Sequence, residues 1–157
     1  MTDAVPFDPE NLPEFRRWAD GFIPPVEGVD YVRNHLSTTQ ASIFLRMILP
    51  GFVKQEGCIL VDFLTSDTAV RSWRQVRGDD KAAIETGINR LILWDWFDAD
   101  DAIEERALVD MAERIAVAWK QRASDAFPER NFRSWVNHDY GPTVVLCTTD
   151  GQQEATR

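Results

Sequence analysis

The sequence predicts an α+β fold, with several helices packed on one face of a small, mainly antiparallel sheet of three to four strands. A long apolar stripe at helical spacing runs through residues 103–123 and stops before Pro128. Two segments of alternating apolar residues follow, 132–137 and 143–149, joined by a short turn. A hairpin alone is marginally stable in water, so this pattern requires helices that cover its apolar face.

Length and composition predict one compact domain. The chain has 157 residues, of which 44% are hydrophobic and 27% charged, as in ordinary globular proteins. We expect a single globular domain over residues 1–150 and a disordered polar tail over residues 151–157. The start of the chain has no basic and apolar leader, and no stretch approaches the ~20 apolar residues of a membrane span. These features predict a cytoplasmic protein with no membrane partner.

The N-terminal third predicts three short helices after an irregular start. Residues 14–19 and 29–36 form the first two, and Gly21 with two following prolines separates them. Residues 37–40 have the pattern of a capping box, a hydroxyl followed three residues later by Gln, and open a helix that continues to Ile48. A strand is the alternative for residues 42–49, but the cap favours the helix.

The middle of the chain predicts a hairpin and two further helices. Residues 52–64 contain two apolar segments separated by Glu56-Gly57, which is typical of a tight turn. Ser66 caps a helix that Gly78 closes. Residues 79–97 carry apolar side chains at helical spacing and predict the next helix, before Asp101 opens the long C-terminal one.

Cysteine and histidine usage predicts no metal or cofactor. Cys58 and Cys147 both lie in predicted strands, where buried reduced thiols are the usual state. The only histidines are His35 and His138, so no zinc-ligand spacing exists. Counting a calcium loop from Asp98 places apolar residues at its fifth and sixth positions, so that pattern fails as well.

The charge is concentrated in one segment. The formal net charge is −9, which argues against nucleic-acid binding. Residues 95–113 contain eight acidic side chains and one basic side chain, Arg106. Acids at a helix start also complement the helix dipole, so part of this cluster has a structural explanation. The acidity is therefore a local patch.

Three arginines recur every third residue around Trp73, at Arg71, Arg74 and Arg77. On a helix they share one broad face, where they are able to bind a phosphate or a carboxylate. The simpler interpretation, which we favour, is that they pair with the acidic segment of the same molecule.

Aromatic residues beside the acids define the main candidate binding site. Residues at i and i+2 do not share a helical face, so one of Trp94, Trp96 and Phe97 points outward unless the helix is sandwiched. We favour the sandwiched helix with all three buried, because large aromatic side chains usually find cover. Exposed tryptophan beside acids is typical of an interface anchor. The candidate partner-binding residues are Trp94, Trp96, Asp98, Asp100, Asp101, Glu104 and Glu105.

A second, minor candidate is a ligand site that uses the hairpin turn. His138, Asp139 and Tyr140 group an imidazole, a carboxylate and a phenol, and Asp62 is the one charge in a buried strand. Turns commonly contain such residues, and a hydrogen-bonding role is the ordinary one for Asp62. Motifs for serine nucleophiles, phosphate loops and dinucleotide binding are absent, so we assign no catalytic residue.

These observations favour a non-enzymatic protein-interaction module with an acidic and aromatic surface. Small acidic inhibitor and immunity proteins share this physical profile, although no sequence motif links them to this chain. The expected partner is a protein with a basic surface, or a second copy of this chain through self-association. The alternative is a small enzyme or ligand-binding domain with a pocket between sheet and helices. A nucleic-acid mimic is a third class, but the acidic run is too short and local to favour it.

Overall fold

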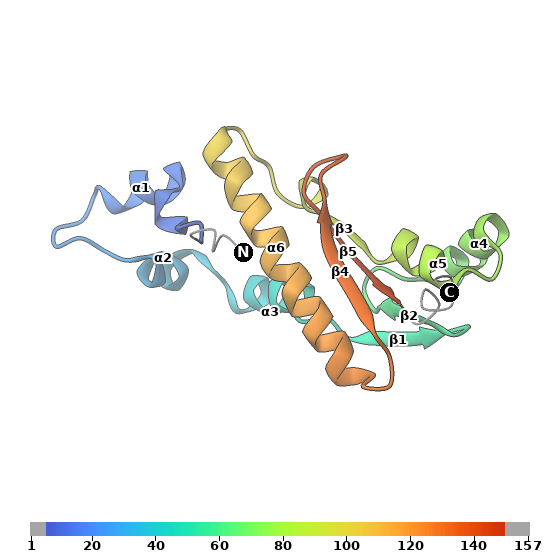
Figure 1. Ribbon diagram of the computed structural model, residues 1–157. Coiled ribbons are helices and arrows are strands. Elements are labelled where there is room, and N and C mark those ends of the chain that lie inside the picture. The colour runs from blue at the N-terminus through green and yellow to red at the C-terminus, as the bar shows by residue number, and fades with distance from the viewer. Residues whose placement is uncertain (1–5, 150–157) are drawn as a thin grey trace.

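The computed structural model describes residues 6–149 and confirms the α+β class. The predicted tail at 151–157 lies outside the described residues. Helices and strands are arranged as Figure 1 shows. In chain order, the regular elements are α1 (Pro13–Ala19), α2 (Gly28–His35), α3 (Thr38–Ile48), β1 (Phe52–Gln55), β2 (Cys58–Val61), α4 (Asp67–Arg77), α5 (Lys81–Ile88), β3 (Arg90–Ile92), α6 (Ala102–Ala126), β4 (Phe132–Asn137) and β5 (Thr143–Thr148). Two single 3-10 turns, η1 (Pro9–Asn11) and η2 (Leu93–Asp95), precede α1 and follow β3.

Five strands form two small antiparallel sheets. β1 and β2 make one hairpin, with Phe52 opposite Val61 and Gln55 opposite Cys58. β4 and β5 make the other, and β3 adds to β5 to give the order β3-β5-β4. Both predicted hairpins are confirmed. The count of strands differs from the expected three to four because β3 was not predicted.

The helix predicted for residues 79–97 ends much earlier, at Ile88. Pairing with β5 explains the stop. After Asn89 the chain extends and Leu91 pairs with Val144 of β5. The apolar residues that resembled a helical stripe are instead a short buried strand and a 3-10 turn.

The side chains of Glu85 in α5 and of Asn89 at its C-terminal end join the two sheets, and we call them the polar clasp. Glu85 and Asn89 are both fully buried. The Glu85 carboxylate accepts hydrogen bonds from the Ile59 amide at 2.7 Å and from the Thr148 amide at 2.6 Å. The Asn89 side chain accepts from the Val61 amide at 2.8 Å and donates to the carbonyls of Ile59 and Leu146. These two side chains therefore take the place of a strand between β2 and β5.

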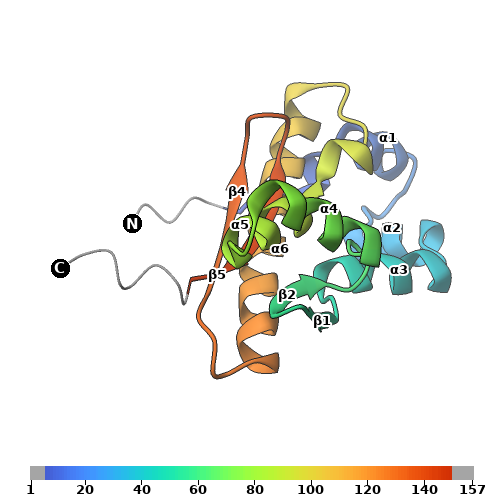
Figure 2. The same ribbon diagram turned by 90° about the vertical axis from the view of Figure 1, so that its right-hand side faces the viewer.

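Helices lie on both sides of β2, whereas the sequence predicts helices on one face only. Ile59 and Val61 face the larger core, which includes α6. Cys58 and Leu60 alternate with them and face Val70 of α4 and neighbouring residues of α5. Figures 1 and 2 show the strands between α6 on one side and α4 with α5 on the other. A strand buried on both faces explains the nearly continuous apolar run of β2.

α6 is the central covering helix. Asp101 caps its start by accepting hydrogen bonds from the Ile103 and Glu104 amides. Trp119 is fully buried, and its indole N–H donates to the Met47 carbonyl of α3 at 2.8 Å. The Phe63 ring contacts the Trp119 ring edge-on. This tryptophan therefore connects α6 to α3 and to the segment after β2.

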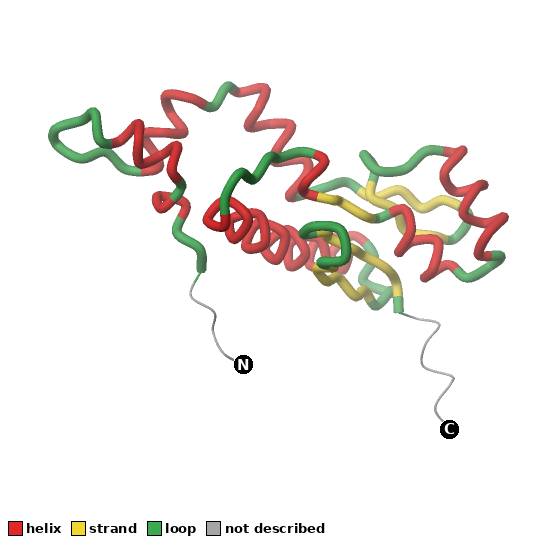
Figure 3. Tube along the Cα trace, turned by 90° about the horizontal axis from the view of Figure 1, so that it is seen from above, coloured by secondary structure: helices red, strands yellow, loops and turns green. Residues whose placement is uncertain are grey.

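The N-terminal arm, residues 6–36, differs from the rest of the chain. None of residues 6–46 has a buried side chain. α1 and α2 are held together by aromatic contacts, in which Trp18 touches both Tyr31 and His35. Figures 1 and 3 show α1 and α2 standing away from α6 and the sheets. The arm is thus an ordered hairpin of helices without a buried core.

One carboxylate ties the start of the arm to α6. Asp110 accepts hydrogen bonds from the Phe7 amide at 3.1 Å and from Arg114 at 2.6 Å. Partial burial alone would raise the pKa of Asp110, but these two hydrogen bonds and the Arg114 charge together lower it. The ionised carboxylate is therefore favoured in the folded protein.

Acidification should release this tether. Because the pKa of Asp110 is lower in the folded chain, its contribution is present above the unfolded value of about 3.9 and is lost as the pH falls through the folded value. We expect hydrogen exchange of the Phe7 amide, corrected for its intrinsic pH dependence, to speed up as the pH falls through the folded pKa of Asp110, which lies below the unfolded value. Asp110→Asn should remove that acceleration, and Glu113→Gln should not. Unchanged protection of Phe7 at a pH where NMR shows the Asp110 carboxyl protonated, with α6 still protected, would refute the tether.

Both cysteines are free and buried, as predicted. Burial is the main cause that raises the pKa of the Cys58 thiol and of the Cys147 thiol. Within residues 6–149, no helix is both long and apolar enough to cross a membrane.

Candidate acidic-aromatic binding site

The sequence predicts that Trp94 and Trp96 lie on a long helix. Instead, Trp94 lies on the 3-10 turn η2 and Trp96 lies just after it. They are 43% and 53% exposed, so the favoured interpretation that both are buried together with Phe97 is wrong. Phe97, the neighbouring aromatic residue, packs against the main core instead. The buried Leu93 holds this turn in place, because its amide donates a hydrogen bond to the Pro142 carbonyl at 3.0 Å. The two indoles are thus presented on a supported turn.

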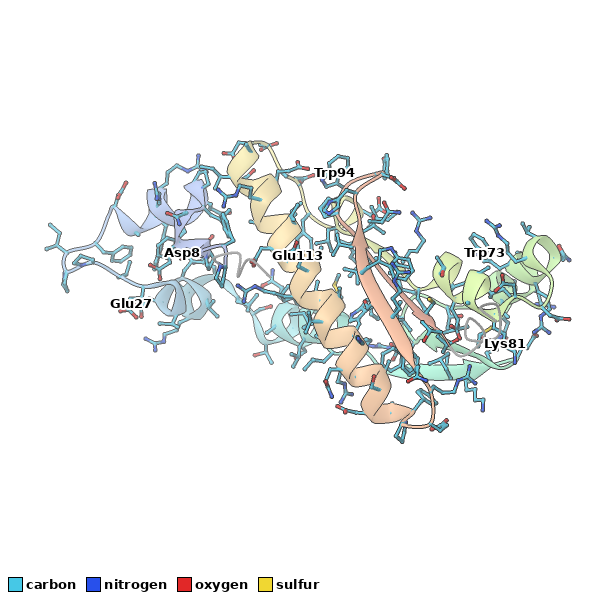
Figure 4. All side chains as sticks on the ribbon, viewed as in Figure 1. Asp8, Glu27, Trp73, Lys81, Trp94 and Glu113 are labelled. Atoms are coloured by element: carbon cyan, nitrogen blue, oxygen red, sulfur yellow. The ribbon has the colours of Figure 1, made fainter. Side chains whose placement is uncertain are left out.

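The turn between β4 and β5 lies directly beside Trp94 (Figure 4). The Tyr140 ring meets the Trp94 ring edge-on, with 5.8 Å between centroids, and Tyr140 is 64% exposed. Asp139 shapes the turn, because its amide donates to Asn137 and its carboxylate accepts from the Asn137 side chain. The structure therefore joins parts of the two candidate sites, which are far apart in the sequence.

The acidic residues of the candidate site divide into two groups. Asp101 caps α6, and Glu104 accepts a hydrogen bond from the Asp100 amide at 2.6 Å, so both have structural roles. Across residues 6–149, no acid between positions 95 and 105 lies within ion-pair distance of a basic side chain. The exposed acids among them are Asp95, Asp98, Asp100 and Asp101, while Glu105 is half-buried.

We call Trp94, Asp95, Trp96, Asp98, Asp100 and Tyr140 the acidic-aromatic face. Its aromatic rings offer π-faces and its carboxylates lack cationic partners in the described chain. Guanidinium and ammonium groups bind such rings by cation–π contact and such carboxylates by charged hydrogen bonds. The arrangement is suited to binding a cationic surface.

The minor candidate ligand site does not assemble. Asp62 follows β2 and forms an ion pair with Arg46 of α3 at 3.0 Å. His138 lines a shallow hollow between α6 and β4, together with Glu113 and Lys120. Tyr140 instead packs on Trp94. These side chains therefore serve separate parts of the molecule and do not converge on one reacting group.

The arginines of α4 have local partners, so the prediction that they pair with the acidic segment is wrong. Arg74 forms an ion pair with Glu56 in the β1–β2 turn at 2.7 Å. Arg71 donates to the Asp67 carbonyl, and Arg77 lies over the Trp73 ring at 5.9 Å. Figure 1 shows α4 at the side of the molecule away from α6, which leaves the acidic segment without these partners.

Sequence reasoning missed a hollow of about 880 Å³ between the start of α5 and the outer face of β4 and β5. Lys81, Arg133, Trp135 and Cys147 are among the residues that line it. Arg133 lies over the Trp135 ring at 4.9 Å. Alternation along β4 predicts that residues 133 and 135 share a face, but only the position of α5 makes that face concave.

Within the described part of the chain, no group of three or more His, Cys, Asp or Glu side chains is arranged to hold a metal ion. Comparisons of the chain with protein-family models, curated proteins and solved structures found no match.

Gly141 controls the position of Trp94. It has a φ of +67°, and a Cβ atom there would lie 2.4 Å from the indole ring. We expect Gly141→Ala to displace Trp94 and to lower the free energy of unfolding by about 1–2 kcal/mol. Denaturant unfolding and the indole NMR signal of Trp94 measure the two effects. Gly78→Ala is the control, because Gly78 also has positive φ, at 59°, but nothing lies within 4 Å of the added Cβ. If Gly141→Ala left the Trp94 signal where it is, this packing would be refuted.

Proposed function

We propose that this protein is a non-enzymatic interaction module that acts in the cytoplasm and binds a protein with a basic surface through its acidic-aromatic face. One observation carries the proposal: half-exposed Trp94 contacts exposed Tyr140, and half-exposed Trp96 and a set of carboxylates without cationic partners in the described residues follow Trp94 along the chain. Large exposed aromatic side chains are enriched at binding hot spots. Complementary charge speeds association with a basic partner and disfavours an acidic one.

Rigidity of the face supports the same function. The Leu93–Pro142 hydrogen bond and the close packing of Gly141 hold Trp94 in place. A preformed anchor loses little conformational entropy on binding. The local excess of acid also disfavours pairing of this face with the same face of another copy, so a basic partner fits better than self-association here.

Affinity capture with matched variants tests the proposal. The chain is immobilised and exposed to an extract of its own source cells, and retained proteins are identified and quantified. Trp94→Ala with Trp96→Ala should lower retention of the specific basic partner at least about 100-fold, as for hot-spot residues. Asp95→Asn, Asp98→Asn and Asp100→Asn should reduce retention and its dependence on salt.

Charge-matched controls separate the face from overall acidity. Asp20→Asn, Asp79→Asn and Glu129→Gln remove the same number of exposed acids elsewhere and should leave retention unchanged. If the control triple variant lost the partner as completely as the face variants, general acidity would explain binding. If no basic protein were retained by the wild type in a face-dependent manner, the proposed function would be refuted.

A second candidate function is binding of a small anionic ligand in the hollow beside α5. Its volume, about 880 Å³, lies in the range of ligand pockets, and Lys81, Arg133 and Trp135 supply cations and an aromatic ring. This arrangement corresponds to the pocket between sheet and helix expected for a ligand-binding domain. Protection of Cys147 from alkylation by a bound anionic metabolite, lost in Arg133→Ala, would favour it over the interaction module.

A further inference from the structure

The free edge of β4 is the longest unpaired strand edge in the described part of the chain. β4 has six residues, and its partner β5 lies on one side only. The edges that β1 and β3 offer have only four and three residues. Proteins usually protect such an edge with proline, a bulge or several charges. β4 has none of these, because its six pairs with β5 run in unbroken register and Arg133 is its only charged residue.

The pairing with β5 determines which backbone groups of β4 point to the free edge. The Thr149 amide donates to the Asn131 carbonyl, which continues the ladder between the two strands. Because hydrogen-bonded pairs alternate in an antiparallel ladder, the odd-numbered residues of β4 bond to β5. The amides and carbonyls of Phe132, Ser134 and Val136 therefore point outward. Within residues 6–149 these backbone groups have no hydrogen-bond partner.

A hollow of about 680 Å³ lies between α6 and this free edge. The strand residues that line it belong to β4, and none belongs to β3 or β5. Its other wall is one flank of α6, where Ala116 and Val117 adjoin Glu113 and Lys120. Val117 is 72% exposed, so it is available to an apolar group in the hollow. Figure 1 shows α6 running beside β4, and the volume between them, which lies in the range of ligand pockets, leaves the edge accessible.

We propose that this edge binds an extended segment of a partner protein, which adds to the sheet as an antiparallel strand between β4 and the flank of α6. An added strand supplies hydrogen bonds to the outward amides and carbonyls, and its side chains enter the space on either side of the edge. All the strand pairs of this protein are antiparallel among the described residues, and antiparallel pairs are slightly more stable than parallel ones.

The two faces of β4 specify the side chains of the added segment. A residue opposite Ser134 directs its side chain toward α6, where Val117 and Val136 offer apolar contacts. A residue opposite Arg133 directs its side chain to the outer face of the sheet. Arg133 lies over the Trp135 ring there and forms no ion pair within residues 6–149. The segment that fits this edge therefore alternates apolar residues with acidic ones.

A partner segment suits this edge better than a second copy of the chain. A second copy would bring another Arg133 to an edge that already carries one, whereas acidic side chains complement it. The edge shares no residue with the acidic-aromatic face, and it selects acidic groups instead of basic ones. Binding at the edge is therefore independent of the proposed function.

Fluorescence anisotropy of the full chain with a labelled seven-residue peptide of alternating valine and glutamate tests the strand addition. The peptide should bind saturably, with one peptide per chain. N-methylation of the valine amides should weaken binding at least about 100-fold, because these amides face β4 when the valines face α6. N-methylation of the glutamate amides, which point away from β4, should change the dissociation constant less than about threefold. Charge attraction to Arg133 alone would affect the two methylated peptides equally.

Ser134→Pro tests the same edge from the side of the protein. The Ser134 amide points outward, so proline removes one donor from the edge and keeps the pairing with β5. Binding of the valine–glutamate peptide should fall at least about tenfold. Ser134→Ala is the matched control, because it removes the hydroxyl group that donates to the Val145 carbonyl and keeps the amide. This control should bind the peptide like the wild type.

A charge exchange tests the selection of acidic residues. Arg133→Glu should weaken binding of the valine–glutamate peptide at least about tenfold and favour a peptide in which lysine replaces glutamate. Arg122→Glu, at an exposed position of α6, should do neither. Equal effects of the two methylations, the reverse order, or no binding up to about 1 mM peptide would overturn the proposal. A chain that is dimeric by light scattering, and monomeric in Ser134→Pro, would overturn it as well, because the edge would then pair with a second copy.

Discussion

Asn89→Ala is expected to lower the free energy of unfolding by about 3–5 kcal/mol, a large effect for an uncharged residue. The side chain is fully buried and makes three hydrogen bonds to backbone groups of β2 and β5. Alanine would leave one amide and two carbonyls unsatisfied in the interior, at about 1–3 kcal/mol each before any water enters. Urea unfolding followed by circular dichroism measures the loss.

Asn34→Ala and Glu85→Gln are the variants to compare with Asn89→Ala. Asn34 is exposed, and its amide donates only to the Asp30 carbonyl one turn earlier, so Asn34→Ala should change stability by less than about 0.5 kcal/mol. Glu85→Gln should be strongly destabilising like Asn89→Ala, because an amide N–H would face the Ile59 or Thr148 donors. A loss below about 1 kcal/mol for Asn89→Ala would show that the clasp does not hold the two sheets together.

Trp119→Ala should also lower stability by about 3–5 kcal/mol. The indole is fully buried between α6, α3 and Phe63, so its removal creates a large cavity and leaves the Met47 carbonyl without its donor. Trp119→Phe should lose less, because the phenyl ring fills part of the space. Chemical denaturation of both variants provides the measurement.

Trp96→Ala is the matched control for size and chemistry. Trp96 is 53% exposed, so its removal should change stability by less than about 0.5 kcal/mol. For partner binding, the proposed function predicts the reverse order of effects. Trp96→Ala should weaken binding directly, whereas Trp119→Ala should weaken it only by unfolding the protein. Equal losses of stability for the two tryptophans would contradict the assignment of one to the core and the other to a binding face.

Local signals explain which elements the sequence predicts correctly. The capping box at Ser37, the cap at Ser66 and the proline after α6 all act over a few residues, and the helices they delimit are confirmed. β3 was missed because its evidence is long-range. Asn89 bonds to Ile59 and Leu146, 30 and 57 residues away, and these partners decide that the chain leaves the helix there.

The candidate site shows the same division. The sequence places acids and aromatics together at residues 94–105, but it favours burial of Trp94 and Trp96. The structure exposes them because they lie on and just after a 3-10 turn and not on a sandwiched helix. The sequence does not reveal that Tyr140 joins Trp94, because that contact depends on the pairing of β3 with β5. Nor does it separate Asp101 and Glu104, which satisfy backbone amides, from the acids that remain available.

The most direct test of the acidic-aromatic face uses the indole N–H signals of the six tryptophans in a ¹⁵N-labelled sample. Tryptophan-to-phenylalanine variants assign Trp94 and Trp96, and an arginine-rich peptide serves as a defined cationic probe at low ionic strength. We expect these two signals to shift first and to saturate, added salt to reverse the shift, and the Trp119 signal to stay unchanged. Shifts confined to other tryptophans, or equal shifts with a glutamate-rich peptide, would contradict this expectation.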